Sequence, residues 1–178
     1  MNTEEYNIIR RVQQGHTKEY EWLVRKYQAA VYNVILQMTR QHETAEELAQ
    51  DVFVRAFEKI GTFHFKSKFF SWIYRIAINA AISHNKKERR YLNAEHFPEQ
   101  GSRTGEESLD EKERNMLIWS AIDRLKDKYR SVIVLCYFEQ LSYAEIAEIL
   151  DVSEQKVKSR LYDARRLLRS ELEKTNYF

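Results

Sequence analysis

The sequence predicts an all-α protein of two small helical domains joined by a flexible acidic linker, and three observations lead to this prediction. The 178 residues include four glycines and one proline, which is few for a protein with many hairpins or a phosphate-binding loop. Long segments repeat apolar residues at intervals of three and four, as amphipathic helices do. Hydrophobic residues make up 43% of the chain, which is enough to give each domain a core.

The first two helices are expected over residues 3–14 and 16–41, where apolar residues form continuous stripes. The first is short and should pack on something longer, and the second is expected to be a long core helix. Gly15 and Gly61 fall where helices should end, and glycine is common just after a helix C-terminus.

A third helix is expected over residues 44–60, because it opens with TAEE, a capping box with Thr44 as N-cap and Glu47 three residues later. Its apolar face is predicted to hold Leu48, Val52, Phe53, Ala56, Phe57 and Ile60. Its opposite, largely acidic face is predicted to hold Glu46, Glu47, Gln50, Asp51, Arg55 and Glu58. A charged face is usually just solvated, and the alternative is a docking surface for a basic partner helix.

Residues 62–90 crowd aromatic and basic side chains into one segment. Unpaired bases stack on aromatic rings while Lys and Arg neutralise phosphates, so this combination suits melted DNA. The rings are Phe63, Phe65, Phe69, Phe70, Trp72 and Tyr74, and the cations are Lys66, Lys68, Arg75, Lys86, Lys87, Arg89 and Arg90. From about residue 70 to 87 the apolar residues also recur at helix spacing, so a core helix with a solvated basic end is the other interpretation.

Residues 91–113 change in character, with seven acidic residues against two basic ones and no apolar period. Such a segment is typical of a flexible linker. The sequence therefore predicts a first domain over residues 1–90, a linker over 91–112 and a second domain over 113–178.

The second domain is predicted to contain helices over residues 108–125 and 127–139, followed by a helix-turn-helix. Ser142 and Glu145 form a second capping box, and Ser153 should cap the longer helix after a brief turn. The facing apolar positions are Ile146, Ala147, Leu150, Val152, Val157, Leu161 and Ala164. This order of short helix, tight turn and longer helix is typical of DNA-binding proteins.

The exposed side chains of that longer helix offer amide, hydroxyl and cationic donors, the groups that contact phosphates and base edges. They are Gln155, Lys156, Lys158, Ser159, Arg160, Tyr162, Arg165, Arg166 and Arg169. A solvated basic helix is the alternative, and the complete helix-turn-helix pattern favours DNA binding over it.

Composition excludes several functions. A net charge of +2 excludes a strongly basic DNA-coating protein, so a nucleic-acid surface must be local. Cys136 is the single cysteine and the five histidines are scattered, so we expect no disulfide, metal or other cofactor. No signal peptide and no apolar run of membrane-spanning length is recognisable, so we expect a cytoplasmic protein without membrane insertion.

Three stretches in one order carry a resemblance to a known family. They read AEELAQDVFVRAFEKI, FFSWIYRIAINAAISHNKKERR and LKDKYRSVIVLCYFEQLSYAEIAEILDVSEQKVKSRLYDARRLL. With the acidic linker they cover nearly all of the chain, which resembles a bacterial sigma factor of the extracytoplasmic-function (ECF) group of the sigma-70 family. The resemblance implies domains sigma-2 and sigma-4 and a function in promoter-specific transcription initiation. It also implies RNA polymerase core and promoter DNA as partners.

For the first domain, the resemblance implies that the acidic helix docks on the clamp coiled coil of the polymerase β′ subunit through Glu47, Gln50, Asp51 and Arg55. Phe63 and Asn79 match positions at which the family captures a flipped base of the −10 element, and residues 64–68 match its specificity loop. Lys86, Lys87, Arg89 and Arg90 would hold phosphates. The full set expected at the −10 element is Phe63, His64, Phe65, Lys66, Lys68, Trp72, Tyr74, Arg75, Asn79, Lys86 and Lys87.

For the second domain, the resemblance implies contact with the polymerase β flap and with the −35 element. Lys158 and Ser159 match base-contacting positions. The full set expected there is Ser153, Gln155, Lys156, Lys158, Ser159, Arg160, Tyr162, Arg165 and Arg166. Two departures bear on the −35 sequence that is read: Gln155 and Lys156 replace a common small pair, and Asp163 stands where an Arg is common. An anti-sigma factor that clamps both domains is a further expected partner.

Two other classes of protein remain as alternatives. A two-domain regulator could bind duplex DNA without polymerase, but it would have no need of exposed rings beside a basic helix. An enzyme acting on nucleic acid would need a converging cluster of carboxylates or histidines, and the sequence contains no pattern for one. We therefore expect a non-catalytic protein.

Overall fold

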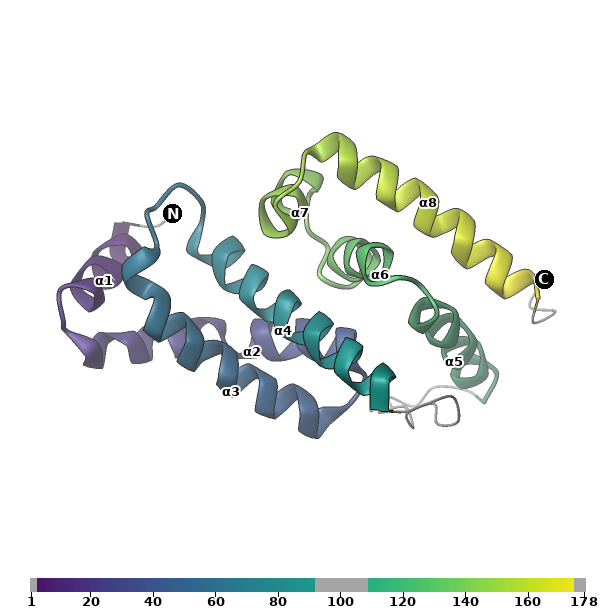
Figure 1. Ribbon diagram of the computed structural model, residues 1–178, viewed down its shortest axis with the longest axis horizontal. Helices are drawn as coiled ribbons and strands as arrows, with labels where there is room; N and C mark the ends of the chain where they lie inside the picture. Colours follow the sequence, from purple (N-terminus) through teal and green to yellow (C-terminus); the bar gives the residue numbers. More distant parts are fainter. Residues whose placement is uncertain (1–2, 92–108, 175–178) are drawn as a thin grey trace. The chain divides into compact units, whose positions relative to one another are not determined.

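The computed structural model describes the backbone of residues 3–91 and 109–174, with side chains for residues 3–90 and 114–174. Within these ranges every regular element is helical, which confirms the all-α fold (Figure 1). The chain divides into two compact units, residues 1–96 and 97–178. Most of the predicted acidic linker, residues 92–108, lies outside the described residues.

The first unit is built around one long helix. α1 (Thr3–Gln13) leads through a 3-10 turn (Thr17–Glu19) to α2 (Tyr20–Thr39), which packs against α1, α3 (His42–Lys59) and α4 (Phe69–Tyr91). Another 3-10 turn, Ile60–Thr62, follows α3. The prediction of a long core helix is confirmed by the fully buried side chains of α2, which are Leu23, Val31, Val34, Ile35 and Met38.

The junctions of the first unit confirm one predicted helix end and correct one helix start. Gly15 has φ +99°, a left-handed conformation that suits glycine after a helix. Thr44 is not the N-cap of α3, because that helix starts at His42 with Gln41 as its N-cap. The Thr44 hydroxyl instead donates to Gln41 Oε1 at 2.7 Å. Arg40, with φ +64°, ends α2 so abruptly that α3 begins at once.

The second unit begins with α5 (Leu109–Asp123) and α6 (Asp127–Ile133) and ends with α7 (Tyr143–Leu150) and α8 (Glu154–Glu173). α8 packs against α5, α6 and α7. The helix predicted over residues 127–139 is not one regular α-helix, because its last part, Val134–Phe138, is a π-helical turn.

The predicted helix-turn-helix is formed by α7 and α8. Ser142 caps α7 in a complete capping box with Glu145, as predicted. Asp151, with φ +54°, ends α7, and the Val152 amide donates to the Ala147 carbonyl at 3.1 Å to close the turn. The two helices pack against each other, and their buried side chains are Ile146, Ala147, Ile149, Val157, Leu161 and Ala164.

Candidate nucleic-acid and protein interfaces

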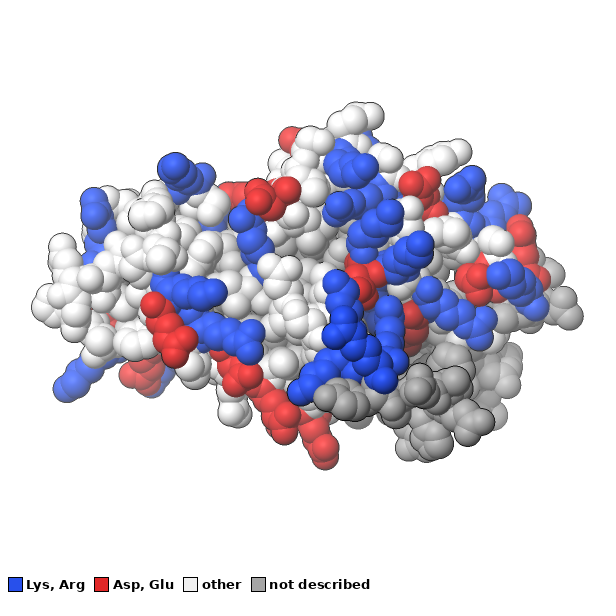
Figure 2. Space-filling view, in the orientation of Figure 1, with Lys and Arg blue, Asp and Glu red and all other residues white. Residues whose placement is uncertain are grey.

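The outer face of α3 is acidic and solvent-exposed, as predicted. Figure 2 shows acidic side chains following this helix along its length. Asp51 and Arg55 form an exposed ion pair, with 3.7 Å between Oδ2 and Nη2. Such pairs contribute little to stability, so their side chains remain available to a partner. The exposed members of this face are Glu46, Glu47, Gln50, Asp51, Arg55 and Glu58.

Two apolar residues of α3 add to this face. Val54 is 58% exposed and Phe57 is 38% exposed. Phe57 was predicted to point inward and instead lies at the surface, where its ring is tilted against Tyr20 with centroids 5.0 Å apart. Val54 was not assigned to this face from the sequence, because a single valine among charged residues does not show which side of a helix it occupies. Exposed apolar groups ringed by charges are typical of protein-binding surfaces.

We call residues 63–68, between the 3-10 turn after α3 and the start of α4, the aromatic loop. Phe63, at its start, is 3% exposed. Its ring meets the Phe65 and Phe69 rings edge-on, with centroids 5.0 Å and 5.5 Å away, and the centroid of the Trp72 ring lies 5.4 Å away. Phe63 was predicted to present its ring to an unpaired base. In the structure the ring fills the core beneath the loop, and its contact with a base stays a prediction.

Tyr74 was also expected at the DNA surface and instead belongs to the core. Its side chain is 2% exposed, its ring packs on Phe70 at 4.2 Å between centroids, and its hydroxyl donates to the Ala30 carbonyl of α2 at 3.3 Å. An apolar ring with a satisfied hydroxyl is a normal core tyrosine. Aromatic composition alone could not separate it from the surface rings.

The remaining residues predicted for the −10 element lie at least partly at the surface. Trp72, Arg75, Asn79 and Lys86 recur at intervals of three, four and seven along α4, and this spacing places them on one side of the helix. The exposed members are His64, Lys66, Lys68, Asn79, Lys86 and Lys87, and the half-buried members are Phe65, Trp72 and Arg75. The loop and this side of α4 thus join cations, an amide and partly exposed rings.

The start of α8 has the structure expected of a DNA-reading helix. The Ser153 hydroxyl accepts from the Lys156 amide at 3.2 Å, which confirms the predicted N-cap. Tyr162 is 71% exposed, whereas Arg160 and Asp163 are half-buried. The other exposed residues of the predicted set are Ser153, Gln155, Lys156, Lys158, Ser159, Arg165 and Arg166.

Arg165 differs from its neighbours because a second side chain holds it. Its Nε donates to the Tyr137 hydroxyl at 2.7 Å, and this hydrogen bond raises the pKa of the guanidinium. The π-helical turn carries Tyr137, which is 50% exposed. Arg165 therefore lies at the border between the exposed start of α8 and the groove described next.

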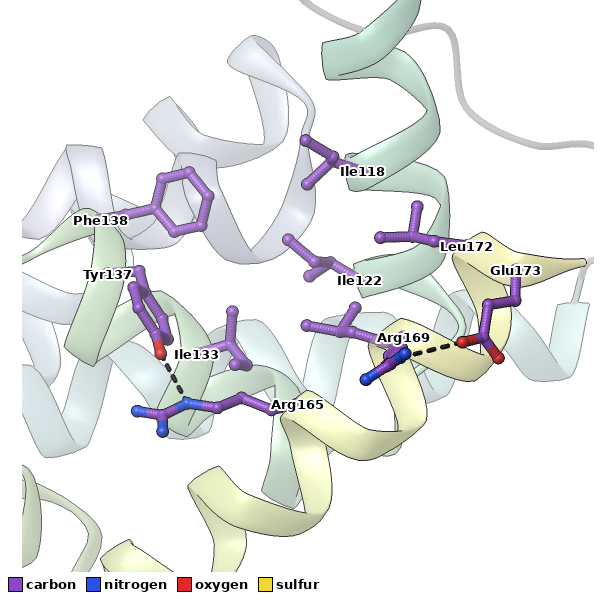
Figure 3. A pocket seen from close by; sticks show the side chains of 10 residues that line it. Ile118, Ile122, Ile133, Tyr137, Phe138, Arg165, Arg169, Leu172 and Glu173 are labelled. Carbon is purple, nitrogen blue, oxygen red and sulfur yellow. Dashed lines mark hydrogen bonds and ion pairs between the residues drawn. The ribbon is translucent and has the colours of Figure 1, made fainter. Parts of the chain in front are cut away.

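An apolar groove of about 680 Å³ lies between α5, α6 with its π-helical turn, and α8 (Figure 3). Arg165, Arg169 and Glu173 stand at its polar edge, and Arg169 Nε contacts Glu173 Oε1 at 2.9 Å. Its apolar lining is provided by Ile118, Ile122, Ile133, Phe138, Leu168 and Leu172. This groove was not predicted from the sequence, because it depends on how three helices meet. Cys136 precedes Tyr137 in the π-helical turn, and burial raises the pKa of its thiol.

Within residues 3–91 and 109–174, no three His, Cys, Asp or Glu side chains gather as a metal site. No helix in the same part of the chain is long and apolar enough to cross a membrane.

Comparison with protein families gives two matches, one in each unit. The family described as sigma-70 region 2 matches residues 23–91, which include the acidic face, the aromatic loop and α4. The family described as sigma-70, region 4, matches residues 115–168, which include most of the groove lining and most of α8.

Relatives of known name match over nearly the whole chain. The ECF RNA polymerase sigma factor SigW of Bacillus subtilis (strain 168) is 34% identical over 176 residues, which cover 92% of this chain and 94% of SigW. The RNA polymerase sigma-H factor of Pseudomonas aeruginosa (strain PAO1) is 30% identical over 174 residues, 91% of this chain and 90% of that protein.

Two solved structures share the fold. CnrH, in complex with the cytosolic domain of CnrY, aligns with a TM-score of 0.67 at 21% identity, over 93% of this chain and 95% of CnrH. The sigma factor RpoE, in complex with the anti-sigma factor NepR from Bartonella quintana, aligns with a TM-score of 0.66 at 23% identity, over 88% of this chain and 98% of RpoE.

Proposed function

Because the chain belongs to the sigma-70 family of RNA polymerase sigma factors, in the extracytoplasmic-function group, we propose a division of labour between its two units. The protein directs promoter-specific transcription initiation. Residues 1–90 serve to dock on core polymerase and to read and melt the −10 element. Residues 113–178 read the −35 element, with residues 91–112 as the linker.

Docking on the β′ clamp is assigned to the acidic face of α3. Glu47, Gln50, Asp51 and Arg55 are all exposed, and Val54 adds an apolar contact at their centre. Charged groups around an apolar centre steer a basic partner and then exclude water from the contact. These features support α3 as the polymerase-binding helix.

Contact with the −10 element is assigned to the exposed side chains of the aromatic loop and α4. Asn79 offers both a donor and an acceptor to a base edge, and Lys66, Lys68, Lys86 and Lys87 can neutralise phosphates. Phe65 and Trp72 are the partly exposed rings available for stacking. Phe63 and Tyr74 support this surface from below, because both are buried.

The observation that carries the assignment of the −35 element is the exposed, polar start of α8 after a tight turn. Its N-terminal amides can face a phosphate beside the Ser153 cap. Lys158 and Ser159 are the proposed base contacts, with Lys156 and Arg166 at phosphates. Asp163 is half-buried, and we propose it as an acceptor for a cytosine amino group.

The groove of α5, α6 and α8 is assigned to the polymerase β flap. This proposal assigns the start of α8 to DNA. The apolar groove is a separate surface of the same unit, and it is suited to binding a protein. Its apolar lining and charged edge fit an amphipathic segment better than a nucleic acid.

Regulation by an anti-sigma factor is the second partnership we propose. The sigma factor RpoE was solved in complex with the anti-sigma factor NepR, and CnrH was solved in complex with the cytosolic domain of CnrY. A partner that covered α3 and α8 would block both polymerase and DNA. The protein has no catalytic role of its own in this proposal. Bacterial RNA polymerase works in the cytoplasm, which is the location we propose.

Run-off transcription with purified core polymerase on a promoter library tests the proposal. Transcripts that require the protein should fall with Asp51→Ala, Asn79→Ala and Lys158→Ala. Lys18→Ala and Asn33→Ala, at exposed positions outside these surfaces, are matched controls and should leave the transcripts unchanged. Binding to duplex DNA without core association or initiation would instead favour a regulator that works without polymerase.

A further inference from the structure

Gln13, the last residue of α1, bonds to the backbone at the entrance of the aromatic loop. Its Nε2 donates to the Ile60 carbonyl at 2.8 Å and to the Phe63 carbonyl at 2.9 Å. A side-chain amide has two hydrogens, so both bonds can form at once, and both distances are normal. The Phe63 amide also donates to the Ile60 carbonyl at 3.1 Å. One side chain thus holds both carbonyls of the turn that leads into the loop.

A second contact from α1 holds the middle of the loop. The centroids of the Phe65 and Tyr6 rings lie 4.6 Å apart, and Arg10 Cζ lies 5.5 Å from the Phe65 centroid. Arg10 Nε in turn donates to the Tyr6 hydroxyl at 3.0 Å. Phe65 has φ +58°, a conformation that a bulky residue rarely adopts and that surrounding contacts must maintain.

These contacts determine how the exposed part of the loop is presented. His64, Lys66 and Lys68 are exposed. They lie beside or shortly after Phe63 and Phe65, the two residues that α1 contacts. Phosphate contacts tolerate small displacements, because a charge acts over distance, whereas base-edge contacts require donors and acceptors in fixed positions. Movement of the loop should therefore reduce the preference for one base over another more than it reduces overall binding.

We propose that α1 is a brace for the aromatic loop and that Gln13 is a positioning residue for base selection at the −10 element. This inference rests on the proposed function, in which the loop contacts that element. Gln13 touches no DNA in this proposal. It acts by fixing the turn from which the loop starts, while Tyr6 and Arg10 hold Phe65.

The test compares Gln13→Glu with Gln14→Glu. The first keeps the size of the side chain, but a carboxylate cannot donate to a carbonyl, so both hydrogen bonds are lost. Gln14 is the exposed neighbour, so its substitution makes the same charge change without touching the turn. Gln13→Met removes the donors without adding charge, and it serves as the second variant if the charged one folds poorly.

Each variant is assembled with core polymerase and assayed on a promoter that the wild type selects from a library randomised at the −10 element. The readout is the ratio of transcription from that promoter to transcription from its single-base variants. Losing two hydrogen bonds should lower this ratio by roughly fivefold for Gln13→Glu and Gln13→Met. Gln14→Glu should leave it unchanged.

Hydrogen exchange of the full-length protein provides a readout that does not depend on transcription. Amides of residues 62–68 should exchange faster in both Gln13 variants and at the wild-type rate in Gln14→Glu. Equal losses on every promoter would indicate a structural role and overturn the inference, as would unchanged base preference or unchanged exchange. A wild type that supports no transcription would refute the proposed function, and exchange would still decide whether the brace exists.

Discussion

Glu5 is a buried acid on α1, and two α2 side chains use it as their acceptor. It is 5% exposed, forms an ion pair with Lys26 and accepts a hydrogen bond from the Tyr27 hydroxyl at 2.9 Å. Replacing it with alanine leaves both groups without their partner, which should lower the free energy of unfolding by about 1–3 kcal/mol. Urea denaturation followed by circular dichroism measures the change.

Glu21→Ala is the matched control for this prediction. Glu21 also pairs with a cation of α2, Arg25, but both side chains are more than half exposed. An exposed pair of this kind contributes about 0.3–0.5 kcal/mol. Similar losses for the two variants would mean that burial of Glu5 does not decide its importance.

The buried phenols of Tyr20 and Tyr27 should make the folded protein less stable at alkaline pH. Burial raises the pKa of both phenols, and the hydrogen bond to Glu5 and its negative charge raise that of Tyr27 further. The folded protein therefore favours the neutral phenols, whereas an unfolded chain ionises tyrosine at about pH 10. Their contribution to stability is complete below that pH and is lost as pH rises from it toward the folded-state pKa values.

Ultraviolet titration of tyrosine, recorded together with circular dichroism, checks this expectation. Of the eleven tyrosines, at least these two should ionise only as helix content is lost. Tyr20→Phe should remove one such group. Ionisation of all eleven while the helices remain intact would contradict the prediction.

At the residue scale, local sequence patterns predicted exposure well where charge decided it and poorly where rings were concerned. Asp51 and Arg55 are exposed as predicted, because burying either charge would be costly. Phe63 and Tyr74 could not be separated from Phe65 by composition, since a ring is equally suited to a core and to a base. The Gln13 contacts with residues 60 and 63 join distant positions and leave no local pattern.

At the element scale, the N-cap of α7 gives a stability prediction. α7 has eight residues, so one end bond is a large share of its total. Ser142→Ala removes the hydroxyl that accepts from the Glu145 amide at 3.3 Å and should cost about 0.5–2 kcal/mol. Urea denaturation of the full chain measures this. Ser170→Ala, at an exposed position within α8, should change stability by less than about 0.5 kcal/mol.

The three serine and threonine caps that the sequence predicted explain which helix boundaries can be read from sequence. Ser142 and Ser153 follow a turn that ends the previous element, so their side chains meet free amides. Thr44 fits the same pattern, yet α3 had already begun at His42. The π-helical turn at the end of α6 was not predicted either, because local propensity does not distinguish it from an α-helix.

Val54 gives the prediction for α3. Val54 is 58% exposed in the wild type, so Val54→Lys should leave folding unchanged. It should weaken binding to core polymerase by about tenfold, because a charge would occupy the apolar centre of the contact. Gln28→Lys, at an exposed position of α2, is the control. Binding is measured by titrating labelled protein with core. Equal affinities of the two variants would remove Val54 from the docking surface.

At the scale of the whole molecule, charge is arranged by surface rather than by total. The net charge is +2, yet α3 presents acids while the start of α8 presents cations. Local fields of opposite sign let one small protein attract a basic protein surface and a phosphate backbone at different places. The separation of these surfaces into different units also predicts that their functions can be removed one at a time.

Promoters with a scrambled −35 element test that separation. Lys158→Ala should reduce transcription from an intact promoter, but wild type and variant should become equal once the −35 sequence is scrambled, because the lost contact no longer exists in either complex. Asn79→Ala should reduce transcription on both promoters, since its proposed contact is with the −10 element. Asp51→Ala should reduce transcription on every template through weaker core binding. If Lys158→Ala lowered transcription equally on intact and scrambled promoters, α8 would contribute through core binding or folding, and its role in reading the −35 element would be wrong.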